Sequence, residues 1–129
     1  MALNARNKGA AGERELARWL MEHLSLSELP QRNLEQVRSG GADLTPVGNL
    51  LFEVKRCEVL QLNSWWIQVK SAARYDQEPV VAFRQNRKQW MFLISAKHIG
   101  VENGYLLLNG YTFLKWANDQ LNKLDNAGS

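Results

Sequence analysis

The run LLFEVKR, residues 50–56, constrains the fold of this 129-residue chain more than any other segment. Its apolar residues predict a strand, and residues two apart on a strand point to the same side. Glu53 and Lys55 therefore share one side, while the even-numbered apolar residues share the other and can face a helix. A buried charge is costly without compensation, so this pair at the end of a core strand needs a partner, a metal or a cleft.

A second carboxylate, that of Asp43, lies ten residues before Glu53 and just after a pair of glycines. A turn here puts Asp43 at the end of the neighbouring strand, where the two carboxylates can converge. Two close carboxylates repel each other unless a cation lies between them. Their oxygens suit Mg²⁺ or Mn²⁺, and the backbone carbonyl of Val54 can complete such a site. Lys55 can then orient the attacking water or stabilise charge on phosphorus, as phosphodiester hydrolysis requires.

The alternative interpretation is a structural Glu–Lys pair on an edge strand, with Asp43 serving only the turn. A third carboxylate, that of Glu13, favours the metal site over this alternative. Residues 8–24 predict a helix with apolar residues at i, i+3 and i+4 spacing. The stripe consists of Leu16, Ala17, Leu20 and Leu24. Extending the stripe back by one turn reaches Glu13, so this glutamate shares the core-facing side of the helix with the leucines.

The remaining elements follow from periodicity and from the Gly and Pro positions. We expect strands at 32–39, 79–85 and 89–95, an edge strand at 104–110, and helices at 62–76 and 111–124. Helix, strands, helix, strands, helix is the order of an α/β protein in which helices pack on a mixed sheet. The length of the chain indicates one domain.

The composition of the chain limits which binding partners and cofactors are plausible. The net charge is +3, and residues 50–100 hold eight Lys and Arg against four Asp and Glu. A basic middle suits a phosphate backbone, although ordinary surface solubility explains it equally well. The single cysteine, Cys57, excludes an intramolecular disulfide and a cysteine-rich zinc site. We find no apolar run of membrane-span length and no apolar centre of a secretory signal, and so expect a cytoplasmic protein without a membrane partner.

Three segments, "NKGAAGERELARWL", "VRSGGADL" and "NLLFEVKR", together resemble the PD-(D/E)XK nuclease superfamily. The resemblance is closest to the archaeal-type Holliday junction resolvases and their phage-borne relatives. It covers residues 7–57 well and continues loosely through 62–76 and the following strand. It implies a restriction-endonuclease-like αβββαβ core, here with a C-terminal helix, in a single nuclease domain, residues 1–129. Such enzymes cut branched DNA as homodimers with Mg²⁺. The departure is an alanine, Ala42, where the name-giving motif has proline.

The resemblance also implies roles for individual residues. Asp43 matches the acidic residue of the second strand, and Glu53 and Lys55 match the E-x-K triplet. Glu13 matches a helix glutamate that assists the metal through water. Gln68 matches a helix glutamine of some relatives, although an ordinary surface residue is the interpretation that we favour.

The DNA-binding residues are predicted from the resemblance and from charge. Lys8 matches the lysine that opens the first helix of the family, and Ser39 matches a serine near its second strand. Arg14 and Arg18, one helical turn apart, face either phosphate or solvent. The basic middle contributes Lys70, Arg84, Arg87 and Lys88.

These observations together predict a Mg²⁺-dependent DNA endonuclease that acts as a homodimer, and the resemblance alone implies that its substrate is branched DNA, especially a four-way junction. Two alternatives remain open: an endonuclease of the same fold on duplex or single strands, and a non-catalytic DNA-binding module. A dimer interface is expected at 89–95 or 104–113, with Trp90 or Tyr105 partly buried there. For Trp90, burial in the core of its own chain is the interpretation that we favour.

Overall fold

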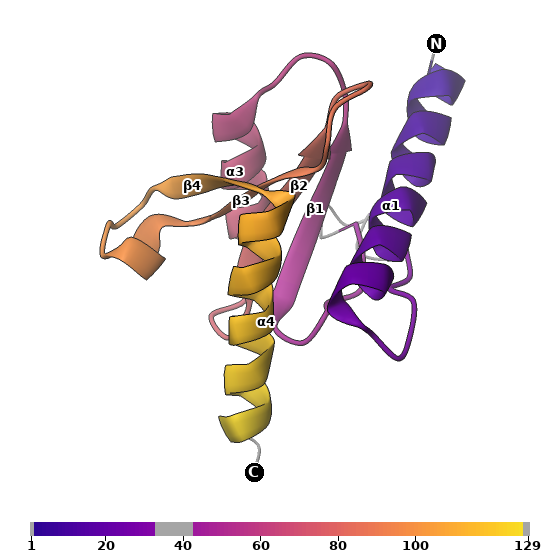
Figure 1. Ribbon diagram of the computed structural model, residues 1–129. Coiled ribbons are helices and arrows are strands. Elements are labelled where there is room, and N and C mark those ends of the chain that lie inside the picture. Colours follow the sequence, from indigo (N-terminus) through magenta and orange to yellow (C-terminus); the bar gives the residue numbers. More distant parts are fainter. Residues whose placement is uncertain (1, 33–42, 128–129) are drawn as a thin grey trace.

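The computed structural model describes residues 2–32 and 43–127, with the side chains of residues 9–32 and 43–125. Its sheet has four strands in the order β1-β2-β3-β4 (Figure 1). The strands are β1 (Leu50–Arg56), β2 (Glu78–Arg84), β3 (Met91–Ser95) and β4 (Tyr105–Asn109). β1 and β2 are parallel, whereas β2–β3 and β3–β4 are antiparallel pairs. The sheet is therefore mixed, as the sequence predicts.

In the part of the chain that the structure describes, three α-helices and one short 3₁₀ helix accompany the sheet: α1 (Ala2–Leu24), α3 (Leu62–Ala72), η1 (Ala96–Ile99) and α4 (Gly110–Ala127). The predicted α/β class with a C-terminal helix is confirmed, and the arrangement is consistent with a restriction-endonuclease-like core. None of the described helices combines the length and the apolarity that crossing a bilayer requires.

The two faces of the sheet are covered differently (Figure 1). α1 and α4 pack on the face that carries the even-numbered residues of β1, with Leu20, Phe52, Phe92 and Phe113 in the larger core cluster. The rings of Phe92 and Phe113 stack at 3.9 Å between centroids. α3 covers the opposite face through a smaller cluster that includes Trp66. The predicted alternation in β1 is thus confirmed, and it directs Glu53 and Lys55 to the α3 face.

The chain before β1 forms a tight turn. The backbones of Val47 and Leu50 exchange hydrogen bonds of 3.0 and 2.8 Å around a two-residue loop. Gly48 in this loop has φ of 58°, a conformation that glycine adopts without strain. Further back, the N–H of Asp43 donates to the carbonyl of Phe52 at 3.3 Å. This turn therefore places Asp43 beside β1, whereas the glycine pair before Asp43, where a turn was also expected, lies outside the described residues.

Several boundaries differ from those expected. α1 begins at Ala2 and not at residue 8, and α4 extends to Ala127. α3 ends at Ala72 and not at residue 76, because Ala73 is extended, with φ of −78° and ψ of 136°. The strand expected at 32–39 lies outside the described residues except for Arg32, which forms an isolated bridge with Leu44.

The segment 89–95 does not offer a sheet edge to a second chain. Its strand, β3, lies between β2 and β4, and Trp90 is buried in the core of its own chain. Burial, the favoured interpretation of Trp90, is thus confirmed. Among the described strands, β4 is the edge strand at this end of the sheet. Only the 104–113 segment therefore remains as an expected interface.

Candidate active site

Asp43 is held against the backbone of β1. The N–H of Val54 donates to Asp43 Oδ2 at 2.8 Å. On a strand, the N–H and C=O groups of one residue point to the same edge, so the carbonyl of Val54 also faces the edge where Asp43 lies. A carboxylate and a backbone oxygen are thereby brought to one point beside the strand.

Glu53 is the second carboxylate, and it is buried with 2% exposure. Its Oε1 accepts a hydrogen bond of 2.7 Å from Gln68 Nε2, a residue of α3. The ammonium of Lys55 lies 3.9 Å from the same oxygen. The other oxygen, Oε2, is buried and has no hydrogen-bond partner among the described residues. Because a buried polar atom without a partner is costly, Oε2 is a site where a ligand would lower the free energy.

Glu13 reaches the same region from α1. It is 6% exposed, as the helical stripe predicts, and its Oε2 forms an ion pair with Arg32 Nε. Its charge contributes to the environment of both Asp43 and Glu53. Three carboxylates from three separate segments therefore act on one another.

This crowding changes the acidity of the central pair. Burial raises the pKa of Asp43 to about 6, against the hydrogen bond from Val54, and the charge of Glu13 adds to the increase. Burial likewise raises the pKa of Glu53 to about 8, with further increases from Asp43 and Glu13 that Lys55 partly offsets. The two carboxylates thus resist being charged together in the absence of a cation.

These groups fit a divalent cation with oxygen ligands. The unpartnered oxygen of Glu53, the carboxylate of Asp43 and the carbonyl of Val54 are hard ligands of the kind that Mg²⁺ prefers. Within residues 2–32 and 43–127, no three His, Cys, Asp or Glu side chains are grouped closely enough to hold a metal together.

The expected DNA-binding residues fall into two groups. Arg14 is exposed on α1, and Arg87 and Lys88 are exposed in the turn after β2. Arg84, at the end of β2, is bound by the carboxylate of Glu15 and by the carbonyl of Lys88 at 2.7 Å.

The second group lies elsewhere. Lys70 is on α3, which covers the opposite face of the sheet, and its Nζ lies 3.4 Å from Asn103 Oδ1. The structure therefore does not bring Lys70 together with the arginines of α1. Ser39 and the side chain of Lys8 lie outside the described residues.

Two residues of the site were missed or undervalued from the sequence. Gln68 is exposed, as expected for a surface residue, yet its amide contacts the buried Glu53. A polar residue on a helix carries no sequence signal for such a tertiary contact, although the family resemblance had marked this position. Arg32, which pairs with Glu13, has no signal at all in its own segment.

A mixed sheet in which a buried glutamate, a half-buried aspartate and a lysine meet at the first described strand is typical of a restriction-endonuclease-like protein. The sequence matches the family described as phage putative PDDEXK endonuclease over residues 4–115, and the chain belongs to this family. By family it is a nuclease whose substrate is DNA, and nucleases of this superfamily generally use divalent metals. No curated protein and no solved structure matches the chain.

Proposed function

We propose that this protein is a Mg²⁺-dependent DNA endonuclease and that residues 1–129 form its single nuclease domain. Asp43, Glu53 and the carbonyl of Val54 would hold Mg²⁺ or Mn²⁺, and Glu13 would support it through water. The observation that carries the proposal is the buried Oε2 of Glu53, which has no hydrogen-bond partner among the described residues, next to a second carboxylate of raised pKa. The family match supports the same chemistry independently.

When bound, a divalent ion would offset the negative charge that develops on the phosphate and make the attacking water easier to deprotonate. The residues of the chain position the reactants. The N–H of Val54 fixes Asp43, and the amide of Gln68 fixes Glu53. Hydrolysis adds water across one P–O bond, and the leaving oxygen takes up a proton. The ammonium of Lys55 can orient that water or donate to a phosphate oxygen as its charge grows.

The test compares variants of the two site carboxylates with a variant of a buried glutamate outside the site. Asp43→Asn and Glu53→Gln should each lower the rate of DNA cleavage in Mg²⁺ by about 10³-fold, while DNA binding in EDTA stays near the wild-type level. Glu78→Gln is the matched control, because Glu78 is also buried and also paired with a lysine. Thermal melting checks that all three variants are folded. Near wild-type cleavage by either site variant contradicts the assignment.

The substrate that we propose is branched DNA, in particular a four-way junction. The resemblance to archaeal-type junction resolvases supports this substrate. The experiment is cleavage of labelled junction, duplex and single strand, with and without Mg²⁺. A preference for the junction is expected. Equal cutting of plain duplex would favour the nuclease without junction selectivity, and tight binding without any cleavage would favour a non-catalytic module.

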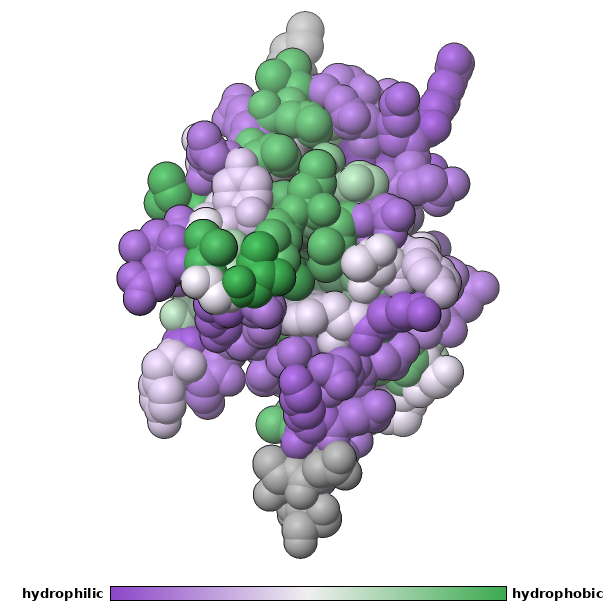
Figure 2. All heavy atoms as spheres, turned by 60° about the vertical axis from the view of Figure 1, so that its left-hand side comes forward, coloured by the Kyte–Doolittle hydropathy of each residue, from purple (hydrophilic) through white to green (hydrophobic). Residues whose placement is uncertain are grey.

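We also propose a homodimer that uses the 104–113 segment. β4 is an edge strand, and no charged residue occurs between residues 103 and 114, although charges are a common protection of exposed edges. Figure 2 shows apolar side chains gathered on the face that comes forward from the left of Figure 1, where β4 and η1 lie. Exposed residues of this region include Ile99, Val101 and Leu107. Sedimentation at micromolar concentration tests the dimer, and a single species near 15 kDa rejects it.

A further inference from the structure

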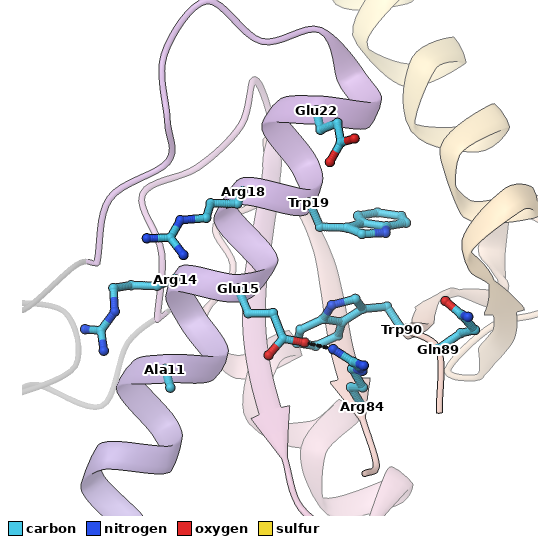
Figure 3. Close-up of a pocket in the computed structure, with 9 residues that line it drawn as sticks. All are labelled: Ala11, Arg14, Glu15, Arg18, Trp19, Glu22, Arg84, Gln89 and Trp90. Atoms are coloured by element: carbon cyan, nitrogen blue, oxygen red, sulfur yellow. Dashed lines mark hydrogen bonds and ion pairs between the residues drawn. The ribbon is translucent and has the colours of Figure 1, made fainter. Parts of the chain in front are cut away.

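A pocket of about 590 Å³ lies between α1 and the turn that follows β2 (Figure 3). Figure 3 shows the guanidinium groups of Arg14 and Arg18 on one side of α1 and the indole of Trp19 on the other. Arg84 and Trp90 lie between the helix and the sheet. The pocket therefore combines basic and aromatic side chains, and neither the metal site nor the proposed dimer accounts for it.

Two further pockets adjoin this one, since each shares lining residues with it. One, of about 320 Å³, shares Arg14 and Arg18 with it and is also lined by Glu13 and Arg32 of the candidate active site. The other, of about 410 Å³, shares Trp19 and Trp90 and is also lined by Tyr111 of α4. We call the three together the α1 groove. The groove runs from the candidate active site across α1 to the beginning of α4.

Most of the charges along the α1 groove suit a phosphate backbone, and the exposed carboxylate of Glu22 is the exception among its lining residues. Arg14 and Arg18 are exposed where the groove leaves the active site. The carboxylate of Glu15 is neutralised, because Arg84 and Arg56 both pair with it. At the far end, Lys115 Nζ lies 4.8 Å from the centroid of the Tyr111 ring. Positive charge is thus present at both ends of the groove.

The aromatic side chains suit unpaired bases. Tyr111 is 69% exposed, so one face of its ring is available although Lys115 lies over the other. Trp19 is held in place by His23, whose ring stacks on it at 4.6 Å between centroids. Basic grooves with exposed aromatic rings bind single strands, because bases that are not paired can stack on the rings. Paired bases inside a duplex cannot reach them.

We propose that the α1 groove binds a single DNA strand that leaves the duplex next to the active site. This inference rests on the proposed nuclease function and refines its substrate: among branched DNAs, the favoured ones have a single-stranded arm. A single strand can place unpaired bases in these pockets, whereas a duplex keeps its bases paired inside and can only lie across them. Arg14 and Arg18 bind the phosphates close to the site of cleavage, and Tyr111 stacks on a base further along.

The test uses binding, measured in EDTA so that no strand is cut. Fluorescence anisotropy with labelled oligothymidylate and with labelled duplex gives the two affinities of each variant. Arg18→Ala and Tyr111→Ala should each weaken binding of the single strand about tenfold and that of the duplex less than about twofold. The matched controls are Lys123→Ala, about three turns further along α4, and Tyr75→Ala, a fully exposed tyrosine of the loop after α3. Both controls should bind like the wild type.

Equal weakening on single strand and duplex, or no weakening on either, overturns the inference. Cleavage of the four-way junction by the wild type and not by Asp43→Asn tests the nuclease function separately. If the groove variants bind normally while this cleavage persists, the inference fails and the proposed function stands. If the single-strand defect is found but no DNA is ever cut, the groove stands and the proposed function fails.

Discussion

Two buried glutamates on neighbouring parallel strands differ strongly in the partners of their carboxylate oxygens. Glu78, at the beginning of β2, accepts from Lys97 Nζ at 2.8 Å on one oxygen and lies 3.2 Å from His98 Nε2 on the other. Glu53, in the middle of β1, has its lysine at 3.9 Å and one oxygen without a partner among the described residues.

The difference separates a structural carboxylate from a reactive one. Both oxygens of Glu78 are satisfied, so a further ligand has nothing to gain there. Glu53 is crowded by Asp43 and Glu13, and its pKa is raised to about 8, chiefly by burial. A cation is the ligand that would reverse this cost. The same residue type in the same kind of strand thus supports the fold in one place and, in our proposal, a reaction centre in the other.

The largest difference should appear when each glutamate loses its lysine. Lys55→Met should lower the cleavage rate by about 10²- to 10³-fold, because a positive charge beside the reacting phosphate is removed. Lys97→Met should leave the rate within about threefold, since Lys97 serves Glu78 alone. Single-turnover cleavage in saturating Mg²⁺ measures both. Similar losses in the two variants would mean that the glutamates do not differ in function.

Replacing each glutamate with glutamine should change the stability of the metal-free protein in opposite directions. At pH 8, Glu53→Gln should raise the free energy of unfolding by about 2 kcal/mol, because it removes a carboxylate whose charge is unfavourable in the fold. Glu78→Gln should lower it by about 2 kcal/mol, because Lys97 loses its charged partner. Urea denaturation in EDTA measures both variants against the wild type.

The sign of the pH dependence follows from the raised pKa of Glu53, 4.5 before folding and about 8 after it. A carboxyl group with a raised pKa contributes stability that is fully present below pH 4.5 and is lost as the pH rises through 8. The advantage of Glu53→Gln over the wild type should therefore disappear at pH 4. An advantage that is the same at pH 4 and pH 8 would contradict the electrostatic cause.

Mg²⁺ should offset the loss of stability that the charged Glu53 causes in the wild type at high pH. At pH 8, millimolar Mg²⁺ should raise its stability by about 1 kcal/mol, a few degrees in Tm. At pH 5.5 the gain should shrink, because the carboxyl groups must lose protons before they bind the metal. Glu53→Gln should show no gain at either pH, and Glu78→Gln should gain as the wild type does. Melting curves of each protein with MgCl₂ and with EDTA measure these differences.

What could be predicted from the sequence depended on how local the signal was. The alternation in β1 and the stripe of α1 placed Glu53 and Glu13 correctly, because side-chain direction within one element follows from its period. The contacts between elements were not accessible in this way. Gln68 reaches Glu53 only because α3 crosses over β1, and Arg32 reaches Glu13 only because the chain folds back along α1. Periodicity fixes the face of an element but not its neighbour.

The smallest effect is expected from Gln68, which contacts Glu53 and not the DNA in this proposal. Gln68→Ala should lower the cleavage rate about threefold, since Glu53 keeps its place in the strand but loses the hydrogen bond of 2.7 Å that orients it. The amide donates to the carboxylate and so favours its charged form. Its loss should therefore also shift the acid limb of the pH–rate profile to higher pH, which a purely structural role would not do. Gln77→Ala is the control, because the side chain of Gln77 only binds the backbone of Arg74. A slower rate with an unchanged profile would mean that Gln68 supports the fold of this region and does not set the charge state of Glu53.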